Sequence, residues 1–338
     1  MPDKRSHGGI CLSPVLVRNT NNTPNLGGNV ETETVLTCPV CDRGSSGGTR
    51  FQTVRQHLKW DLLRCSECSF EFWYPLTQAT REFFEETYKS FADVSSKPTL
   101  GTRHRLTLTH MPVSAGTILD IGCGDSLFLP EARRRGFDVW GVDFNRKVIE
   151  KNKTLFKLNN LFAMSVYDFA LLPNLPKFDL ITFFEVLEHV EDPKRFISTV
   201  RNLLKEDAFI ALCLPDSKVW GPCERMLNAP PYHTAHWTAD TLRMFLARNG
   251  FEIIMTKKIG RPDAVDLLMN TLVRFRLMKN TAVAPFKQKI DFYRTRSVFS
   301  YLSKAMKLLL RCVSLPLRQF LYIVGIRPAI YVIAQRKG

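Results

Sequence analysis

From residue 115 onward, short apolar runs alternate with segments of helical periodicity, and this alternation restricts the fold more than any other feature of the chain. Phe178–Phe184 is apolar almost throughout, which is typical of a strand buried on both faces. Strands that alternate with helices predict an α/β fold with a doubly wound, mostly parallel, seven-stranded sheet. The expected strands are Thr117–Ile121, Val139–Val142, Leu161–Ala163, Phe178–Phe184, Ala208–Cys213, Phe251–Thr256 and Ala329–Ala334.

Helix start and stop signals separate these strands. Pro193 stands in the first turn of one expected helix, and Gly250 follows the end of another. Before the alternation begins, Thr77 or Thr80 is expected to cap a further helix that carries Phe83 and Phe84. The helices expected within the alternating region are Phe128–Arg135, Arg146–Leu158, Pro193–Leu204 and Thr238–Asn249.

The loop after the first strand contains two glycines and is the expected ligand site. Gly122 and Gly124 would let a ligand approach the backbone, and doubly wound sheets bind ligands at this edge. A dinucleotide fingerprint would need a third glycine where Leu127 stands, so the pyrophosphate pattern fails. Asp143 closes the second strand, where a carboxylate suits the paired hydroxyls of a ribose. Asp168 follows the third strand, where it suits an adenine amino group.

These segments resemble the class I S-adenosylmethionine-dependent methyltransferases over about residues 113–260 and again over 328–338. The resemblance lies in Leu119–Gly124, in Gly141–Asp143 and in Phe178–Ile181 continuing to Glu185–Val190. It implies a Rossmann-like fold with S-adenosylmethionine as the cofactor, and a strand end at Glu185 beside the sulfonium. The expected cofactor-binding residues are Asp120, Gly122, Cys123, Gly124, Asp143, Asp168 and Glu185.

One departure from the family pattern bears on activity. Many relatives have glycine or another small residue where Asp125 and Ser126 stand. Asp125 is therefore expected either to face the ammonium group of the cofactor or to crowd it. Crowding would favour a cofactor-binding scaffold without catalysis.

Histidines after the fifth strand are the candidate bases for deprotonating a hydroxyl acceptor. His233 and His236 follow that strand at the carboxyl edge of the sheet, and His236 is preferred because it directly precedes a capped helix. The alternative for both is loop packing with hydrogen bonds to the backbone. His189 is expected to be a structural hydrogen-bonding residue.

Two Cys-x-x-Cys pairs mark a compact N-terminal unit. Cys38 with Cys41 and Cys65 with Cys68 are separated by 23 residues, a spacing that lets four thiolates close a tetrahedral zinc site. Four thiolates leave no open position, so the zinc is expected to be structural. The unit is expected to pack on the methyltransferase domain, with nucleic-acid contact as the alternative. The odd count of nine cysteines favours a reducing, cytoplasmic location.

The basic charge of the chain is concentrated near its C-terminal end. Residues 257–338 hold 17 Lys and Arg against three Asp, a net +14 of the +15 carried by the whole chain. Apolar residues between Val298 and Val313 recur at helical spacing opposite Lys304, Lys307 and Arg311. A basic amphipathic helix predicts peripheral association with an anionic membrane surface, here the inner face. The alternatives are packing on the sheet and, less favoured, nucleic-acid binding, because few aromatics are available for stacking.

The sequence thus predicts four parts and one activity. A flexible tail (1–34) precedes a zinc ribbon (35–76), a helical linker (77–112) and a methyltransferase domain (113–338) with a helical basic insertion at 262–327. The expected reaction is in-line methyl transfer to a small-molecule, sugar or lipid-linked glycan acceptor. The rivals are an RNA or protein methyltransferase and the non-catalytic scaffold. No run of 18 apolar residues and no secretory signal is present, so neither a membrane span nor secretion is expected.

Overall fold

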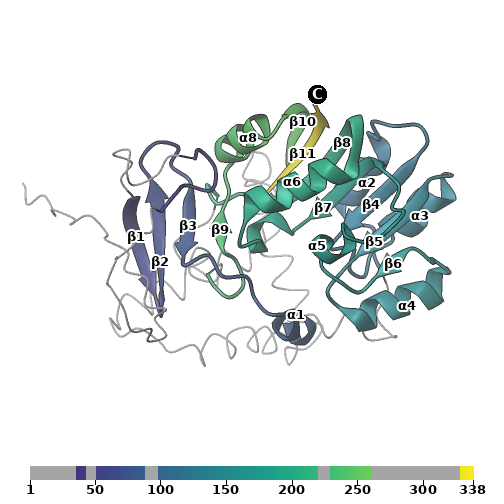
Figure 1. The fold of residues 1–338 in the computed structure, drawn as a ribbon, viewed down its shortest axis with the longest axis horizontal. Helices are drawn as coiled ribbons and strands as arrows, with labels where there is room; N and C mark the ends of the chain where they lie inside the picture. The colour runs from purple at the N-terminus through teal and green to yellow at the C-terminus, as the bar shows by residue number, and fades with distance from the viewer. Residues whose placement is uncertain (1–35, 43–50, 88–97, 220–228, 261–327) are drawn as a thin grey trace, which may run out of the picture.

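The computed structural model describes residues 36–42, 51–87, 98–219, 229–260 and 328–338 (Figure 1). The tail predicted for 1–34 and the basic insertion predicted for 262–327 lie outside the described residues. Among the residues that are described, no helix is both long enough and apolar enough to cross a membrane.

A seven-stranded sheet organises most of the described chain, in the order β10-β11-β8-β7-β4-β5-β6. Neighbouring strands from β6 to β8 run parallel, whereas β11 lies antiparallel between β8 and β10. The predicted α/β fold with a mostly parallel seven-stranded sheet is confirmed. Its strands are β4 (Thr117–Ile121), β5 (Asp138–Val142), β6 (Leu161–Phe162), β7 (Phe178–Phe184), β8 (Leu204–Pro215), β10 (Phe251–Ile259) and β11 (Ala329–Arg336).

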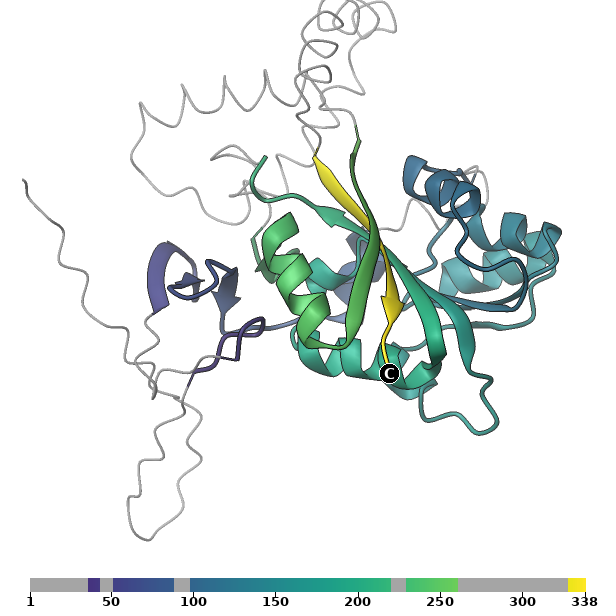
Figure 2. The ribbon, with the colours of Figure 1, turned by 90° about the horizontal axis from the view of Figure 1, so that it is seen from above.

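Helices cover both faces of this sheet (Figure 2). Strand β7 shows why, because its side chains alternate between two buried clusters. Ile181 and Phe183 pack with one cluster, and Leu180 and Phe184 with the other. Burying each such side chain contributes roughly 1.5–3 kcal/mol, so neither face is left to solvent. One cluster includes α5 (Val166–Phe169), α6 (Pro193–Leu203) and α8 (Ala239–Arg248), and the other includes α2 (Thr102–Thr109), α3 (Phe128–Arg134) and α4 (Arg146–Phe156).

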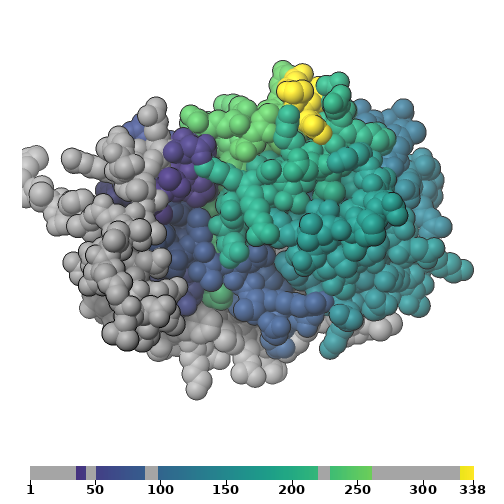
Figure 3. Space-filling model, viewed as in Figure 1, coloured from purple at the N-terminus to yellow at the C-terminus, as the bar shows by residue number. Residues whose placement is uncertain are grey.

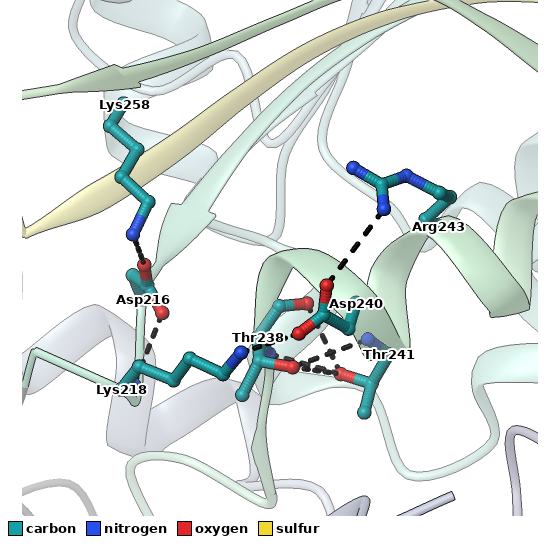
Figure 4. A network of polar contacts seen from close by, with 7 residues as sticks. All are labelled: Asp216, Lys218, Thr238, Asp240, Thr241, Arg243 and Lys258. Atoms are coloured by element: carbon teal, nitrogen blue, oxygen red, sulfur yellow. Dashed lines mark hydrogen bonds and ion pairs between the residues drawn. The ribbon is translucent and has the colours of Figure 1, made fainter.

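The basic insertion leaves and rejoins the sheet at its ligand-binding edge. Ala329, the first residue of β11, pairs with Pro215 at the carboxyl end of β8, and Ile259 at the end of β10 pairs with Ala329. Asp216 reinforces this corner (Figure 4): its backbone N–H donates to the Pro328 carbonyl at 2.8 Å, and its buried carboxylate lies 3.0 Å from Lys258 Nζ. Both ends of the insertion are therefore held where the parallel strands finish.

A second, four-stranded sheet joins the N-terminal unit to the larger domain. Its order is β1-β2-β3-β9, with β1 (Phe51–His57), β2 (Trp60–Cys65) and β3 (Glu71–Tyr74) from the N-terminal unit. Strand β9 (Ala235–His236) comes from the loop after β8 and pairs antiparallel with β3. Phe70 packs on Trp237 with ring centroids 4.6 Å apart. The N-terminal unit thus lies against the larger domain, as Figure 3 shows.

Two helices lie in the segment predicted as a helical linker. Helix α1 (Arg81–Thr87) begins after Thr80, whose Oγ1 accepts the Phe83 N–H at 3.3 Å. Thr80 is therefore one of the two caps expected from the sequence. Helix α2 packs on the sheet through His104, whose ring centroid lies 5.2 Å from that of Phe184 and 5.7 Å from that of Phe128.

Candidate active site

The glycine loop begins where β4 ends, and its backbone conformation explains the glycines. Gly122 and Gly124 have φ angles of 72° and 48°, in the left-handed region that side chains disfavour. A Cβ on Gly122 would also lie 2.7 Å from Val186 Cγ2. The backbone of Gly122 is exposed, so a ligand can reach it directly.

Asp143 connects the tips of the first two strands. Its Oδ2 accepts the Gly124 N–H at 2.9 Å, and its Oδ1 accepts the Asn145 N–H at 2.8 Å. Burial raises the pKa of this carboxyl, although the two backbone donors act in the opposite direction. The carboxylate predicted to grip a ribose therefore lies against the loop predicted to hold the rest of the cofactor.

Asp120 is a buried carboxyl at the end of β4. Only 2% of the residue is exposed, and Thr182 Oγ1 donates to Asp120 Oδ1 at 2.6 Å. Burial raises its pKa to about 7, while Thr182 and Arg103 act in the opposite direction. A cationic ligand in this position would favour the carboxylate form.

The raised pKa of Asp120 predicts a pH effect on the stability of the protein without ligand. The folded state binds the proton more tightly than the unfolded state, so the contribution of Asp120 is fully present below about pH 4. That contribution falls as the pH rises through about 7, by an amount on the order of 4 kcal/mol. Asp120→Asn should flatten this part of a urea-unfolding pH profile. The exposed control Glu206→Gln should leave it unchanged, and a profile unaltered in Asp120→Asn would contradict the assignment.

Glu185 follows the last residue of β7 and has neighbours from two other elements. Arg103 Nη1 of α2 lies 3.9 Å from Glu185 Oε1, and the Cys213 thiol of β8 donates to the same oxygen at 3.5 Å. Burial raises the pKa of Glu185, and Arg103 acts against this rise. Glu188 is 1% exposed, and its pKa is raised well above the usual value by burial and by Glu185.

Asp125 is paired with a lysine of α4 in the structure. Its carboxylate lies 3.1 Å from Lys151 Nζ on α4, and both side chains are at most 5% exposed. The neighbouring Asn152 donates from Nδ2 to the Gly124 carbonyl at 2.8 Å. The two roles expected for Asp125, facing the ammonium group or crowding it, stay predictions. Asp125, the residue that raised the possibility of a non-catalytic scaffold, thus forms an ion pair with Lys151 of α4.

Cys123 and Asp168 lie at the same edge with different surroundings. Cys123 is buried, and its Sγ lies near Gly141, where an added Cβ would approach it to 3.0 Å. Asp168 is exposed in the first turn of α5, where Ser165 Oγ donates to Asp168 Oδ2 at 2.7 Å and accepts the Asp168 N–H. Asp168 therefore stabilises the start of α5. The adenine contact predicted for it stays a prediction.

The two candidate histidine bases are both buried. The His236 side chain is 0% exposed and lies between Trp73 and Glu71, with Nδ1 3.4 Å from Glu71 Oε2. His233 is 5% exposed, and its ring centroid lies 4.7 Å from that of His189. The catalytic roles predicted for them stay predictions, and this burial does not favour them. His189 contacts the Tyr232 carbonyl through Nδ1, in keeping with the structural role expected.

The four cysteines of the N-terminal unit meet at one point. One sulfur from each of Cys38, Cys41, Cys65 and Cys68 lies within 4.8 Å of the others. Cys38 and Cys68 sulfurs are 3.6 Å apart, as are those of Cys41 and Cys65. Tetrahedral zinc at about 2.3 Å from each sulfur would place the sulfurs roughly 3.8 Å apart, so the donor set fits. Burial raises the pKa of Cys65 to about 11, so the thiolate form needs a cation nearby.

A group of aromatic residues lies beside the site. Phe84 of α1 stacks on Phe144, the residue after Asp143, with ring centroids 6.2 Å apart and planes at 6°. Phe84 also meets the His189 ring edge-on at 5.5 Å. Phe83 meets Tyr232 at 6.5 Å. Helix α1 thus places two phenylalanines over the edge where β5 and β7 end.

Two functional candidates escaped the sequence analysis. Arg103 lies on a short helix with no motif, and only packing of α2 against Phe128 and Phe184 brings it to Glu185. Glu188 belongs to the segment that carried the family resemblance, but nothing in its spacing indicated that it would be buried. The available signal was its position three residues after Glu185 in the chain. In the structure Glu188 lies in the short helix Leu187–His189.

Comparisons with known proteins found similarity to methyltransferases. Residues 98–256 match the family model described as a methyltransferase domain. Ubiquinone biosynthesis O-methyltransferase of Bartonella tribocorum is 33% identical over 157 residues, and that of Caulobacter vibrioides 30% over 149. Each match covers 43% of this chain, and the chain spans 63% and 58% of those proteins, respectively. A SAM dependent methyltransferase from Archaeoglobus fulgidus aligns at a TM-score of 0.44 with 18% identity, over 76% of this chain and 100% of that one.

Proposed function

Because residues 98–256 form a methyltransferase domain of the class I S-adenosylmethionine-dependent family, we propose that the protein methylates an oxygen of a small molecule. The observation that carries this proposal is the placement of Asp143, whose carboxylate bonds the Gly124 N–H at the tip of β5. A ribose would bind at Asp143 and the rest of a methyl donor at the glycine loop, and this hydrogen bond holds the two together.

The charge of the site supports a cationic cofactor. Asp120, Asp143, Glu185 and Glu188 are carboxyls whose pKa values are all raised, chiefly by burial. S-adenosylmethionine carries a sulfonium and an ammonium, which would favour the ionised forms of Asp120 and Asp143. Arg103 is the cation recorded near three of these carboxyls, Asp120, Glu185 and Glu188, and it is suited to a carboxylate of the methyl donor.

The residues of the chain mainly bind and orient the reactants. When bound, S-adenosylmethionine supplies a methyl group already activated on sulfur. Gly122 and Gly124 allow close approach, Asp143 holds a diol, and the β7 edge limits where an acceptor can lie. Such positioning can lower a barrier by about 7–11 kcal/mol.

The acceptor that suits the site best is an aromatic molecule with a hydroxyl group. Phe84 and Tyr232 meet the His189 ring at 5.5 Å and 5.3 Å, and Phe144 and Phe83 pack on them, so ring faces and edges gather where β5 and β7 end. Aromatic pairs are stabilised by such contacts beyond simple burial. Two relatives carry the name ubiquinone biosynthesis O-methyltransferase, which is in keeping with oxygen as the methylated atom. The sugar and lipid-linked glycan acceptors considered from the sequence have less support from this aromatic group.

Zinc bound by Cys38, Cys41, Cys65 and Cys68 is proposed to stabilise the N-terminal unit without taking part in methyl transfer. The sulfur spacing supports this role, and four sulfurs leave no coordination position for a substrate. Lys194 of α6 pairs with Asp42, the residue after Cys41, and its positive charge lies near Cys38 and Cys41. A cation there would balance the negative charge of a tetrathiolate site.

Association with an anionic membrane surface is proposed for the basic insertion 262–327. Its ends are held at the carboxyl edge of the sheet, so a membrane bound there would lie next to the acceptor side. We expect the protein to float with liposomes containing phosphatidylglycerol and not with neutral liposomes. High salt should weaken the interaction, because each basic residue contributes about 1 kcal/mol through electrostatics. Equal recovery with both lipids, or steep salt-dependent binding to RNA alone, would contradict this proposal.

The proposed activity is tested with a labelled methyl donor. Purified protein is incubated with methyl-labelled S-adenosylmethionine and 3,4-dihydroxybenzoate as a soluble probe with aromatic hydroxyls. Label found in a methyl ether formed from a hydroxyl group of the probe supports the proposal. Calorimetry that detects no binding of S-adenosylmethionine would overturn it.

A further inference from the structure

Glu185 occupies a strained backbone position at the end of β7. Its φ angle is 58°, which is uncommon for a residue with a side chain, and its N–H donates to the Cys213 carbonyl at 2.7 Å. Such a conformation is unfavourable for a residue with a Cβ and persists where the surrounding structure imposes it. Its side chain remains 36% exposed, in contrast to the buried histidines His233 and His236. Glu185 is therefore an accessible proton acceptor at the end of β7.

Glu188 lies behind Glu185 and has an unusual environment. The residue is 1% exposed, and among the described residues no other residue donates a hydrogen bond to either carboxyl oxygen. An ionised carboxylate without partners would be very unfavourable in that position, so the neutral form is expected at neutral pH. A neutral carboxyl can donate a hydrogen bond, as an ionised one cannot. Glu185 stands three residues earlier in the chain, and its carboxylate can receive this hydrogen bond, which opposes the rise in the pKa of Glu185 that burial causes.

Groups from several elements face this carboxyl pair. Arg103 of α2 lies 3.9 Å from Glu185, and the Cys213 thiol of β8 lies 3.5 Å from it. One nitrogen of His189 and one of His233 lie within 4.8 Å of a Glu188 oxygen. Burial lowers the pKa of His189 to about 4, so this ring is neutral at pH 7. The positive charge identified beside the pair is therefore that of Arg103, which favours Glu185 as the ionised member.

We propose that Glu185 accepts the proton of the acceptor hydroxyl, and that Glu188 is a positioning residue that keeps Glu185 ionised and oriented. This rests on the proposed function. In the step, the acceptor O–H bond breaks and its proton passes to Glu185 while a new O–CH3 bond forms. The S–CH3 bond of the methyl donor breaks, and its electron pair stays on sulfur as a neutral thioether. The partly exposed Glu185 then releases the proton to water.

Kinetics with the probe acceptor 3,4-dihydroxybenzoate distinguish the two roles. Glu185→Gln should lower kcat by about 10²–10⁴-fold, the usual range for loss of a positioned base. The affinity for S-adenosylmethionine, measured by calorimetry, should change less than twofold. The matched control Glu191→Gln removes an exposed carboxylate from the following turn and should leave kcat unchanged. A large loss of cofactor affinity in Glu185→Gln would make Glu185 a cofactor ligand and overturn the proposal.

Glu188 variants test positioning through the pH profile. Glu188→Gln keeps a hydrogen-bond donor and should retain most of kcat. Glu188→Met removes the donor, so the acid limb of the kcat profile should move to higher pH. Replacing Glu188, a buried acid that receives no hydrogen bond from another described residue, by methionine should not lower the melting temperature. An unmoved acid limb in Glu188→Met, or equal loss in both variants, would show a merely structural role.

Infrared spectroscopy tests the proton on Glu188 without any acceptor. The difference spectrum of wild type minus Glu188→Gln at pH 7 should show a protonated carboxyl band that shifts in deuterated water. Carboxylate bands in its place would overturn the proposal, even where the probe is not methylated. Absence of cofactor binding would instead contradict the proposed function and leave this band in place, so the two failures are distinguishable.

Discussion

Replacing Asp143 by alanine is expected to weaken S-adenosylmethionine binding by at least about 100-fold. The carboxylate is placed to receive two ribose hydroxyls, and hydrogen bonds to a charged group contribute about 1.5–3 kcal/mol each. The same change removes the acceptor of the Gly124 and Asn145 N–H groups, so the glycine loop also loses an anchor. Calorimetry measures the affinity, and circular dichroism verifies the fold.

Asp138 provides a matched control for this experiment. It stands at the opposite end of the same strand, β5, and its carboxylate accepts from Trp140 Nε1 and Asn160 Nδ2 rather than from the glycine loop. Asp138→Ala should therefore bind the cofactor normally. Asp143→Asn keeps one acceptor oxygen for the loop while removing the charge, and it should still bind poorly. Normal affinity in both Asp143 variants would show that the cofactor site lies elsewhere.

Cys38→Ser is expected to release the bound zinc and unfold the N-terminal unit. Structural zinc contributes on the order of 10–16 kcal/mol to small metal-binding units, which bury too little apolar surface to fold without it. Because β3 pairs with β9, the loss should also expose Trp73, which is 0% exposed in the intact protein. Atomic emission measures the zinc, and tryptophan fluorescence and limited proteolysis report on the unit.

The cofactor site should survive this change, because the glycine loop and Asp143 belong to the larger sheet. Cys213→Ser serves as the control, since Cys213 lies in β8, away from the four clustered sulfurs, and should keep one zinc per chain. Protein purified without metal and melting at the same temperature as the zinc-loaded form would contradict the zinc assignment.

The sequence was sufficient where the determining interactions are local. The alternation of apolar runs with helical segments located every strand of the larger sheet. Strand β7 has the predicted bounds Phe178–Phe184 and is buried on both faces. Gly122 and Gly124 were recognisable because their positive φ angles are a property of single residues. The same holds for the two Cys-x-x-Cys turns, each of which is followed by a residue with positive φ, Asp42 and Ser69.

Long-range packing decided what periodicity and spacing could not. Pairing of β9 with β3 buries His236 against Glu71, a partner 165 positions away in the chain. Lys151 forms a buried ion pair with Asp125, and packing of α2 brings Arg103 to Glu185. The sequence therefore determined the strands, the glycine loop and the cysteine pairs, because each depends on neighbouring residues. Only the tertiary structure decided which acidic side chains are buried or remain accessible, because burial depends on elements distant in the chain.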